Sequence, residues 1–384
     1  MSRHFDFAII GAGVFGAWTA HYLQRSGAHV ALIDAYGAAN GRASSSGETR
    51  VIRAGYGPDE LYTRWAVRSF SLWREFFDRV GLRLFHRTGV LWLCNDADLY
   101  TRQLLDVLKN NEVQFEKLSA ADIRKRYPQF VFEDVTWGIL ETQSGLLMAR
   151  QAVQALVTEL VRSGVDYQIA SVLPPQDSSA LSQVRTSSGV SISADTFIFA
   201  CGPWLPKLFP QLLADRIFPT RQEVFFLGPP PGNTDYCSPQ MPVWLHHGHP
   251  DIPYALPNIE NRGLKIAFDR HGPSFDPDTS NRVVQAAAVD QLRSFLKKHL
   301  PAMHDAPILE TRVCQYENTS NGDFLIDRHP DFDNVWIAGG GSGHGFKHGP
   351  AAADYLSARI LHNAPAEPRF SLATKQTVQM RAVY

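Results

Sequence analysis

Residues 5–34 constrain the fold of this chain more than any other segment. An apolar run at 7–10 is typical of a buried parallel strand, 14–26 has the period of a helix, and 29–33 is a second apolar strand. Strand–helix–strand units of this kind build parallel sheets with helices on their faces. The segment therefore predicts an α/β fold.

The turn between the first strand and the helix carries Gly11, Gly13 and Gly16 with G-x-G-x-x-G spacing. The first glycine permits a tight turn, the second lets the backbone approach a pyrophosphate, and the third lets helix and strand pack closely. The helix N-terminus then faces the phosphates, and Asp34 can accept hydrogen bonds from a ribose. A glycine-rich turn without a ligand is the alternative. The context favours a dinucleotide, either NAD or FAD.

Composition narrows the class of protein. The chain has 384 residues, which is suited to about two domains. Its net charge of −1 offers no field that would attract nucleic acid or an anionic membrane. No two of the four cysteines form a C-x-x-C pair, so free thiols are expected. Without a signal peptide or a membrane-spanning apolar run, we expect a cytoplasmic protein that binds neither nucleic acid nor a membrane.

Periodicity and capping signals predict the remaining elements. Helices are expected at 59–80, 97–110, 149–163, 283–300 and 350–361, and strands at 84–94, 135–141, 165–172, 196–200, 243–246, 253–256, 264–268 and 334–338. The α/β pattern breaks off near residue 80, resumes, and breaks off again near residue 216.

This interruption predicts two domains. A discontinuous Rossmann-like domain is expected at 1–82, 145–215 and 318–384. A substrate domain, built on a mainly antiparallel sheet, is expected at 83–144 and 216–317 as an insertion.

A second strand–glycine–helix unit near the C-terminus favours FAD over NAD. The strand at 334–338 leads into the loop GGGSGHGFK at 339–347 and then into a helix. An NAD-binding domain needs only the first glycine turn, whereas FAD also needs a binding site for its flavin ring, far from the adenine. Backbone N–H groups at a helix N-terminus can stabilise a flavin carbonyl and the reduced anionic ring.

Six segments together resemble a known family: GAGVFG at 11–16, GETRVIRAGYG at 47–57, RTGVL at 87–91, GLKIAF at 263–268, VCQYENTSNGDFLIDRHP at 313–330 and GSGHGFK at 341–347. They resemble the monomeric sarcosine oxidase and N-methyltryptophan oxidase group of FAD-dependent amine oxidases, within the D-amino-acid oxidase superfamily. The resemblance covers nearly the whole chain. It implies a monomeric flavoenzyme that oxidises an amino acid with O₂ and releases hydrogen peroxide.

The resemblance implies specific roles. Cys314 matches the cysteine that holds FAD through a thioether; a buried free thiol is the alternative. Lys265 matches the lysine that accelerates reduction of O₂, where an ammonium stabilises the developing negative charge; a surface lysine on a strand edge is the alternative. Arg53 and Lys347 match the pair that binds the substrate carboxylate.

Two groups of candidate residues follow. The candidate catalytic residues are Lys265, Arg53, Lys347, Tyr254, Tyr316 and Asp269, with both tyrosines lining the substrate pocket. The candidate cofactor residues are Gly11, Gly13, Val14, Phe15, Gly16, Asp34, Ser45, Ser46, Thr49, Arg50, Val172, Cys201, Gly202, Trp204, Cys314, Gly341, Gly343, His344, Gly345, Phe346 and Lys347.

The chain departs from the sarcosine-oxidising members at two places where they carry histidines. Ser45 and Ser46 occupy one place and Asp269 the other. Asp269, as an acid near the substrate, can pair with a second cationic group, or it can turn to solvent and pair with Arg270. The cluster His246, His247 and His249 lacks partners at zinc-site spacing, so no metal is expected.

We therefore expect a flavoprotein oxidase acting on a secondary amine such as an N-methyl or cyclic imino acid. One alternative is a dehydrogenase that passes electrons to a quinone or a protein, against which Lys265 argues. The other is a non-catalytic flavin-binding subunit, against which the carboxylate-binding pair argues.

Overall fold

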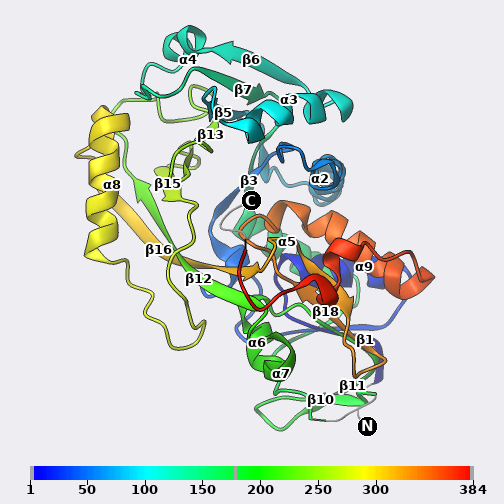
Figure 1. Ribbon diagram of the computed structural model, residues 1–384. Coiled ribbons are helices and arrows are strands. Elements are labelled where there is room, and N and C mark those ends of the chain that lie inside the picture. The colour runs from blue at the N-terminus through cyan, green and yellow to red at the C-terminus, as the bar shows by residue number, and fades with distance from the viewer. Residues whose placement is uncertain (1–3, 177–179, 381–384) are drawn as a thin grey trace.

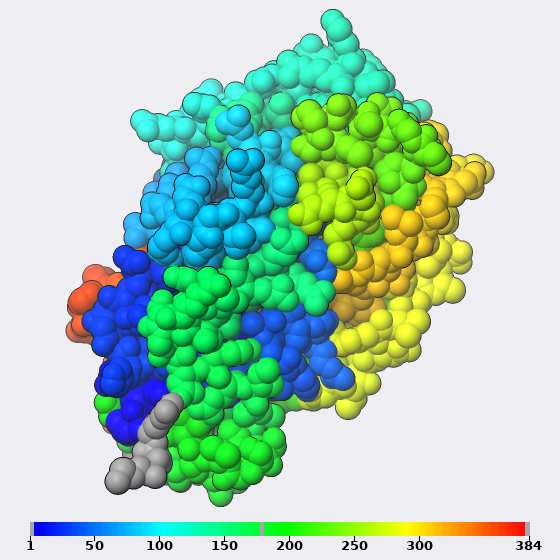
Figure 2. Space-filling model, turned by 180° about the vertical axis from the view of Figure 1, so that it is seen from behind, coloured from blue at the N-terminus to red at the C-terminus, as the bar shows by residue number. Residues whose placement is uncertain are grey.

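The computed structural model describes residues 4–176 and 180–380, which form two large sheets and a small third one. In Figure 1 the first large sheet lies in the lower half of the molecule, and the second extends from the top of the view to its middle. The helices α8 and α9 lie at opposite edges, both in this view and from behind in Figure 2. No helix in the described residues is long and apolar enough to cross a membrane.

The first sheet has seven strands in the order β17-β18-β11-β1-β2-β9, with β10 paired to β11. The strands β9, β2, β1, β11 and β18 run parallel, and the other two pairings are antiparallel. The bounds are β1 His4–Ile10, β2 Val30–Asp34, β9 Asp166–Ile169, β10 Gln183–Arg185, β11 Ser191–Phe199, β17 Leu325–Arg328 and β18 Val335–Gly339. This arrangement confirms the α/β prediction.

Alternating side chains bury both faces of this sheet. Ile9, Leu32 and Ile198 share a core with α1 (Val14–Arg25), α5 (Ala149–Arg162) and α9 (Gly349–His362). Their immediate neighbours on each strand share a second core with the short helices α6 (Leu205–Leu208) and α7 (Pro210–Leu213). The long helix α2 (Glu60–Val80) packs against α9.

The second sheet has eight strands in the order β16-β12-β15-β14-β13-β5-β7-β6. All neighbours are antiparallel except β13 and β5, which confirms the mainly antiparallel prediction. The helix α8 (Ala286–His299) covers one face through Leu292, Phe295 and Leu296, and α3 (Leu99–Asn110) and α4 (Ala120–Arg126) lie at the far end (Figure 1). The strand bounds are β5 Val90–Cys94, β6 Phe115–Ser119, β7 Trp137–Glu141, β12 Ile217–Leu227, β13 Val243–Leu245, β14 Pro253–Leu256, β15 Leu264–Phe268 and β16 Ile308–Thr319.

The prediction of one strand over 84–94 is wrong. The segment forms β4 (Phe85–His86) in a three-stranded sheet with β3 (Thr49–Ile52) and β8 (Gly145–Met148), and then β5 in the eight-stranded sheet. The chain changes sheets at Gly89, which adopts a φ of +75° that favours glycine.

The predicted start of the helix at residue 283 is also wrong, because α8 begins at Ala286. The Arg221 guanidinium donates to the Val283 carbonyl, and Glu223 accepts the Gln285 N–H. These contacts hold the backbone outside the helix at the three residues before it.

Strand pairing links the two proposed domains. β4 lies in the proposed substrate domain but pairs with β8, and β16 crosses the proposed boundary at 317/318. Residues 1–3 and 381–384 of the proposed cofactor domain lie outside the described residues.

Candidate active site

A cavity of about 400 Å³ lies where the first sheet meets β16, and the first glycine turn forms one end of it. Gly11 has a φ of +106°, and a Cβ there would lie 2.3 Å from the Ala200 carbonyl oxygen. A Cβ on Gly16 would lie 1.8 Å from the Gly11 oxygen, so the third glycine permits the close packing of α1 on β1. The turn is therefore built as the sequence predicts.

Asp34 and Ser45 bind backbone N–H groups at the glycine-turn end of the cavity. Asp34 accepts from the backbone N–H of Ala12 (2.8 Å) and Tyr36 (2.9 Å), and Ser45 Oγ accepts the Val14 N–H (3.1 Å). Burial raises the pKa of Asp34. The first N–H groups of α1 have no partner within the helix and can meet the phosphates of a dinucleotide.

Most candidate cofactor residues line this cavity, from both glycine loops and from β16. They are Gly11, Gly13, Val14, Phe15, Asp34, Ser45, Arg50, Val172, Cys201, Gly202, Trp204, Cys314, Gly341, Gly343, Gly345 and Phe346. Gly16 and Ser46 line neither this cavity nor the second one described below, and Thr49, His344 and Lys347 line only the second.

Glu317 is a cavity residue that the sequence reasoning missed. Its Oε1 accepts the Gly341 N–H (3.1 Å), whereas its buried Oε2 has no hydrogen-bond partner within residues 4–176 and 180–380. A buried, unpaired oxygen at a cavity wall fits a ligand that brings hydroxyl groups, as the ribityl chain of FAD does. Together with the phosphate-facing helix end and the cavity volume, this donor and acceptor set fits FAD.

Glu317 also predicts a pH-dependent stability. Burial raises its pKa to about 7 from an ordinary value of 4.5, so the folded protein binds the proton more tightly than the unfolded chain. Its stabilising contribution is complete below pH 4.5 and is lost as the pH rises through about 7, on the order of 3 kcal/mol in cofactor-free protein.

Urea unfolding of the FAD-free protein at several pH values measures this contribution, in a Cys314→Ser background if the flavin is covalent. Adding Glu317→Gln should flatten the decline in stability between pH 5 and pH 8. Equal slopes with and without Glu317→Gln would contradict the assignment.

The loop of residues 44–50 contributes to both cavities: Ser44 and Ser45 line the first, Thr49 lines the second, and Arg50 lines both. Glu48 is buried and binds Arg312 Nη2 (2.6 Å) and Arg150 Nη1 (3.1 Å), which fixes the loop to β16 and α5. Arg50 donates to the carbonyls of Ser44, Gly47 and Thr49, and its Nη2 lies 3.3 Å from Cys314 Sγ. Cys314 thus faces the cofactor cavity beside a guanidinium.

A second cavity of about 100 Å³ adjoins the first. Both are lined by Arg50, Cys314, Tyr316, Gly343 and Phe346. The alternation of β15 places Lys265 at this cavity, while Leu264 and Ile266 pack in the core beneath α8. A ligand in the second cavity therefore lies beside a ligand in the first.

Lys265 is only 2% exposed, so the structure excludes the alternative of a surface lysine. Its Nζ donates to the carbonyl oxygens of Gly47 (3.0 Å) and Thr49 (2.6 Å). Burial and then the positive charge of Arg50 hold the pKa of Lys265 well below 10.5.

The structure brings Arg53 and Lys347 together around Tyr56, a buried residue that the sequence reasoning did not single out. The Arg53 guanidinium carbon lies 4.6 Å from the centroid of the Tyr56 ring and 4.8 Å from that of Trp92. Lys347 Nζ donates to the Tyr56 hydroxyl (2.8 Å) and to the His344 carbonyl (3.1 Å). Burial and then the positive charge of Arg53 hold the pKa of Lys347 well below 10.5, because both disfavour a charged ammonium at this position. A bound anion would offset this effect and stabilise the charged form of Lys347.

Glu141 was also missed, since a lone acid at a strand end carries no sequence signal. It is fully buried and accepts from the backbone N–H of Ala54 (2.7 Å) and Gly55 (3.0 Å) and from Trp92 Nε1 (2.8 Å). These contacts fix the backbone after Arg53 and the Trp92 ring on which its guanidinium rests.

Asp269 is not turned to solvent and paired with Arg270, so the second of its two predicted alternatives is wrong. It lines the second cavity, and its Oδ1 accepts the Tyr316 hydroxyl. Arg270 points elsewhere and pairs with Asp251 (3.7 Å). Burial raises the pKa of Asp269 in spite of the Tyr316 hydrogen bond and the positive charges of Arg53 and Lys347. Tyr254 lines the same cavity.

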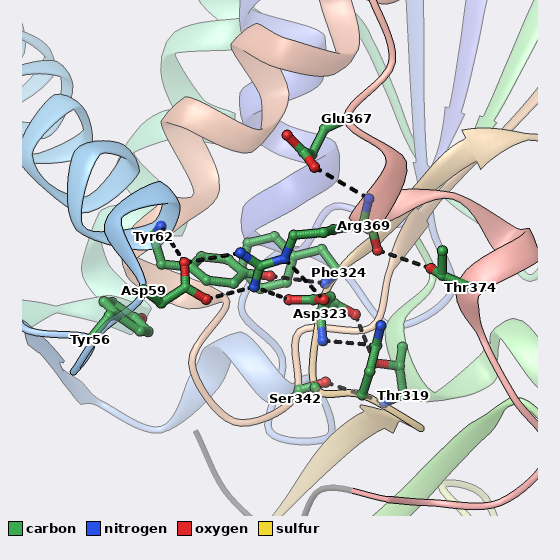
Figure 3. A network of polar contacts seen from close by, with 12 residues as sticks. Tyr56, Asp59, Tyr62, Thr319, Asp323, Phe324, Ser342, Glu367, Arg369 and Thr374 are labelled. Atoms are coloured by element: carbon green, nitrogen blue, oxygen red, sulfur yellow. Dashed lines mark hydrogen bonds and ion pairs between the residues drawn. The ribbon is translucent and has the colours of Figure 1, made fainter. Parts of the chain in front are cut away.

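A segment close to the C-terminus supports the glycine loop from outside. Figure 3 shows the Arg369 guanidinium between the carboxylates of Asp59 and Asp323, with Nη2 2.6 Å from each. Phe324 follows Asp323 and stacks on His344 in the glycine loop, at 4.8 Å between centroids. Arg369 thereby joins Asp59, at the start of α2, to Asp323, which precedes the ring that stacks on the glycine loop.

Across residues 4–176 and 180–380, no group of three or more His, Cys, Asp or Glu residues is placed to hold a metal ion. His246 is fully buried against the rings of Phe132 and His249, and burial lowers its pKa. It is a core histidine in this structure.

Comparisons with known proteins agree with this geometry. A family model described as FAD dependent oxidoreductase (DAO) matches residues 6–359. The monomeric sarcosine oxidase of Bacillus sp. (strain B-0618) is 31% identical over 368 residues, 94% of this chain and 93% of that protein. The N-methyl-L-tryptophan oxidase of Yersinia pestis (strain Pestoides F) is 27% identical over 96% of this chain and 99% of that protein. The solved L-proline dehydrogenase from P. horikoshii has the same fold, with a TM-score of 0.84 at 19% identity over 97% of this chain and 98% of that one.

Proposed function

This chain belongs to the DAO family of FAD-dependent oxidoreductases, and we propose that it oxidises the C–N bond of a small secondary amino acid to an imine, with O₂ reduced to hydrogen peroxide. FAD supplies the electron acceptor for this reaction. The observation that carries the proposal is the adjacency of the two cavities, because the smaller one holds two buried cations at one wall and meets the cofactor cavity at Cys314 and Tyr316.

Arg53 and Lys347 bind the substrate carboxylate in this proposal. Arg53 offers a planar fork and Lys347 a point charge, and both are at least nine-tenths buried, so a carboxylate gains charge-assisted hydrogen bonds in a site with little water. A cavity of about 100 Å³ suits a compact amino acid. The small-molecule partners are then this amino acid and O₂, and we propose a monomer.

Lys265 serves the second half of the reaction. Its ammonium lines the second cavity and shares the carbonyls of Gly47 and Thr49 with Arg50, which lines both cavities. A positive charge there stabilises the negative charge that develops when O₂ accepts an electron. The two carbonyls of the 44–50 loop hold the ammonium in place.

The first test is a screen of anaerobic flavin bleaching. N-methyl amino acids, cyclic imino acids, glycated amino acids and free amino acids of both hands are mixed with the holoenzyme without O₂. Secondary amino acids should bleach the flavin faster than their primary counterparts. The absence of bleaching by every amine would contradict the proposed function.

Cys314 tests the mode of FAD attachment, which we propose to be a thioether. The Cys314 Sγ lines the cofactor cavity and accepts a hydrogen bond from Arg50 Nη2 (3.3 Å). Acid precipitation should leave the wild-type pellet yellow, and Cys314→Ser should release its FAD into the supernatant. Cys201→Ser is the matched control, because Cys201 also lines the cofactor cavity, and this variant should keep its flavin in the pellet. A yellow Cys314→Ser pellet would show attachment at another residue.

A further inference from the structure

Asp269 is the only acidic residue among the described residues that line the second cavity, which is also lined by Arg50, Arg53, Lys265 and Lys347. We propose that Asp269 binds the ammonium group of the substrate, so that the enzyme selects small amino acids in their zwitterionic form. This inference rests on the proposed function and names the charge state of the substrate that the site recognises.

The backbone fixes the direction of this carboxylate. Lys265 and Ala267 alternate with the residues that pack beneath α8, and Asp269 continues the same alternation just beyond β15. The backbone N–H of Asp269 donates to the Ile252 carbonyl (3.0 Å), which holds this end of the strand. A Cβ on Gly343 would lie 2.7 Å from the Tyr316 ring, so the tyrosine that donates to Asp269 is closely packed too.

Asp269 lies among cations without forming an ion pair. Within residues 4–176 and 180–380, no Lys, Arg or His nitrogen lies within 4.0 Å of its carboxylate, and its one side-chain hydrogen bond comes from Tyr316 to Oδ1. Asp269 is half-buried and lines the cavity. A carboxylate held there by a neutral donor gains most from a ligand that brings the missing positive charge.

The size of the cavity decides which positive charge this is. About 100 Å³ suits a compact amino acid better than one with a long basic side chain. The amine nitrogen of such a substrate is separated from its carboxylate by a single carbon. With the carboxylate at Arg53 and Lys347, the ammonium is the cationic group that can reach Asp269.

Two carboxylates of nearly equal shape test this proposal. N,N-dimethylglycine carries a protonated nitrogen where 3-methylbutanoate carries a CH group. Rapid anaerobic mixing of each with the holoenzyme, followed by flavin absorbance, measures binding before any oxidation. The wild type should bind N,N-dimethylglycine roughly tenfold or more tightly than 3-methylbutanoate.

Asp269→Asn should remove this preference while binding 3-methylbutanoate at least as tightly as the wild type, which also shows that its site is intact. Asp251→Asn is the matched control, because Asp251 pairs with Arg270 and does not line the cavity; it should keep the preference. Equal binding of the two ligands by the wild type, or a preference that survives in Asp269→Asn, would overturn the inference. Failure of both ligands to bind would instead contradict the carboxylate site of the proposed function, and the inference with it.

Discussion

Lys265→Met should slow the reaction of the reduced enzyme with O₂ by about 10²-fold or more, while anaerobic reduction by the amine changes only a few-fold. Methionine keeps the length of the side chain and removes the charge that stabilises developing superoxide. Because the substrate carboxylate is assigned to Arg53 and Lys347 and not to Lys265, substrate binding is expected to persist. Stopped-flow spectroscopy measures the two half-reactions separately.

The pH dependence of the O₂ reaction sharpens this prediction. Burial and Arg50 hold the pKa of Lys265 well below 10.5, and the protonated form is the active one. The rate should therefore fall as the pH rises through a value below 10.5, and Lys265→Met should lack this fall. Lys298→Met, at an exposed position on α8, should behave as the wild type in both half-reactions. Equal losses in reduction and in reoxidation would contradict the assigned role.

Arg53→Met should lower kcat/KM for the amino acid by roughly 10²- to 10³-fold, because its removal leaves the substrate carboxylate short of one of two buried cationic partners. The methionine side chain retains part of the packing between Tyr56 and Trp92. The loss should therefore come chiefly from charge and hydrogen bonding.

A comparison of each amino acid with its amide isolates this effect. The wild type should strongly prefer the carboxylate over the amide, and Arg53→Met and Lys347→Met should each lose most of that preference. Arg83→Met, at an exposed arginine, should retain it. If Arg53→Met slowed the acid and the amide equally, Arg53 would support the structure of the site without recognising the carboxylate.

The two sheets were predictable because their signals are local. The glycine turn at 11–16 and the strand at 264–268 are encoded within a few residues, and the structure shows both as expected. The strand over 84–94 was wrong because the change of sheet at Gly89 depends on pairing with β8, which lies more than 50 residues further along the chain.

The unpredicted parts of the site are buried polar contacts between distant segments. Glu141 contacts Ala54 and Trp92, and Glu317 contacts the loop at Gly341. Glu141 stands in no motif, and Glu317 lies in the 313–330 segment without a role that the sequence assigns to it. Each is identified by its burial and its partners. Asp269 was noticed in the sequence as a departure from the family. Only the structure, which places it beside Tyr316, shows that its side chain faces the cavity and is not turned to solvent.

The stoichiometry of O₂ consumption tests the central claim most directly. The holoenzyme is supplied at air saturation with the amine that bleaches its flavin fastest, and dissolved O₂, hydrogen peroxide and imine-derived product are measured together. An oxidase consumes one O₂ and forms one hydrogen peroxide for each amine oxidised. If the flavin is reduced by the amine but no O₂ is consumed until a quinone or a protein acceptor is added, the enzyme is a dehydrogenase and the proposed role of Lys265 is wrong.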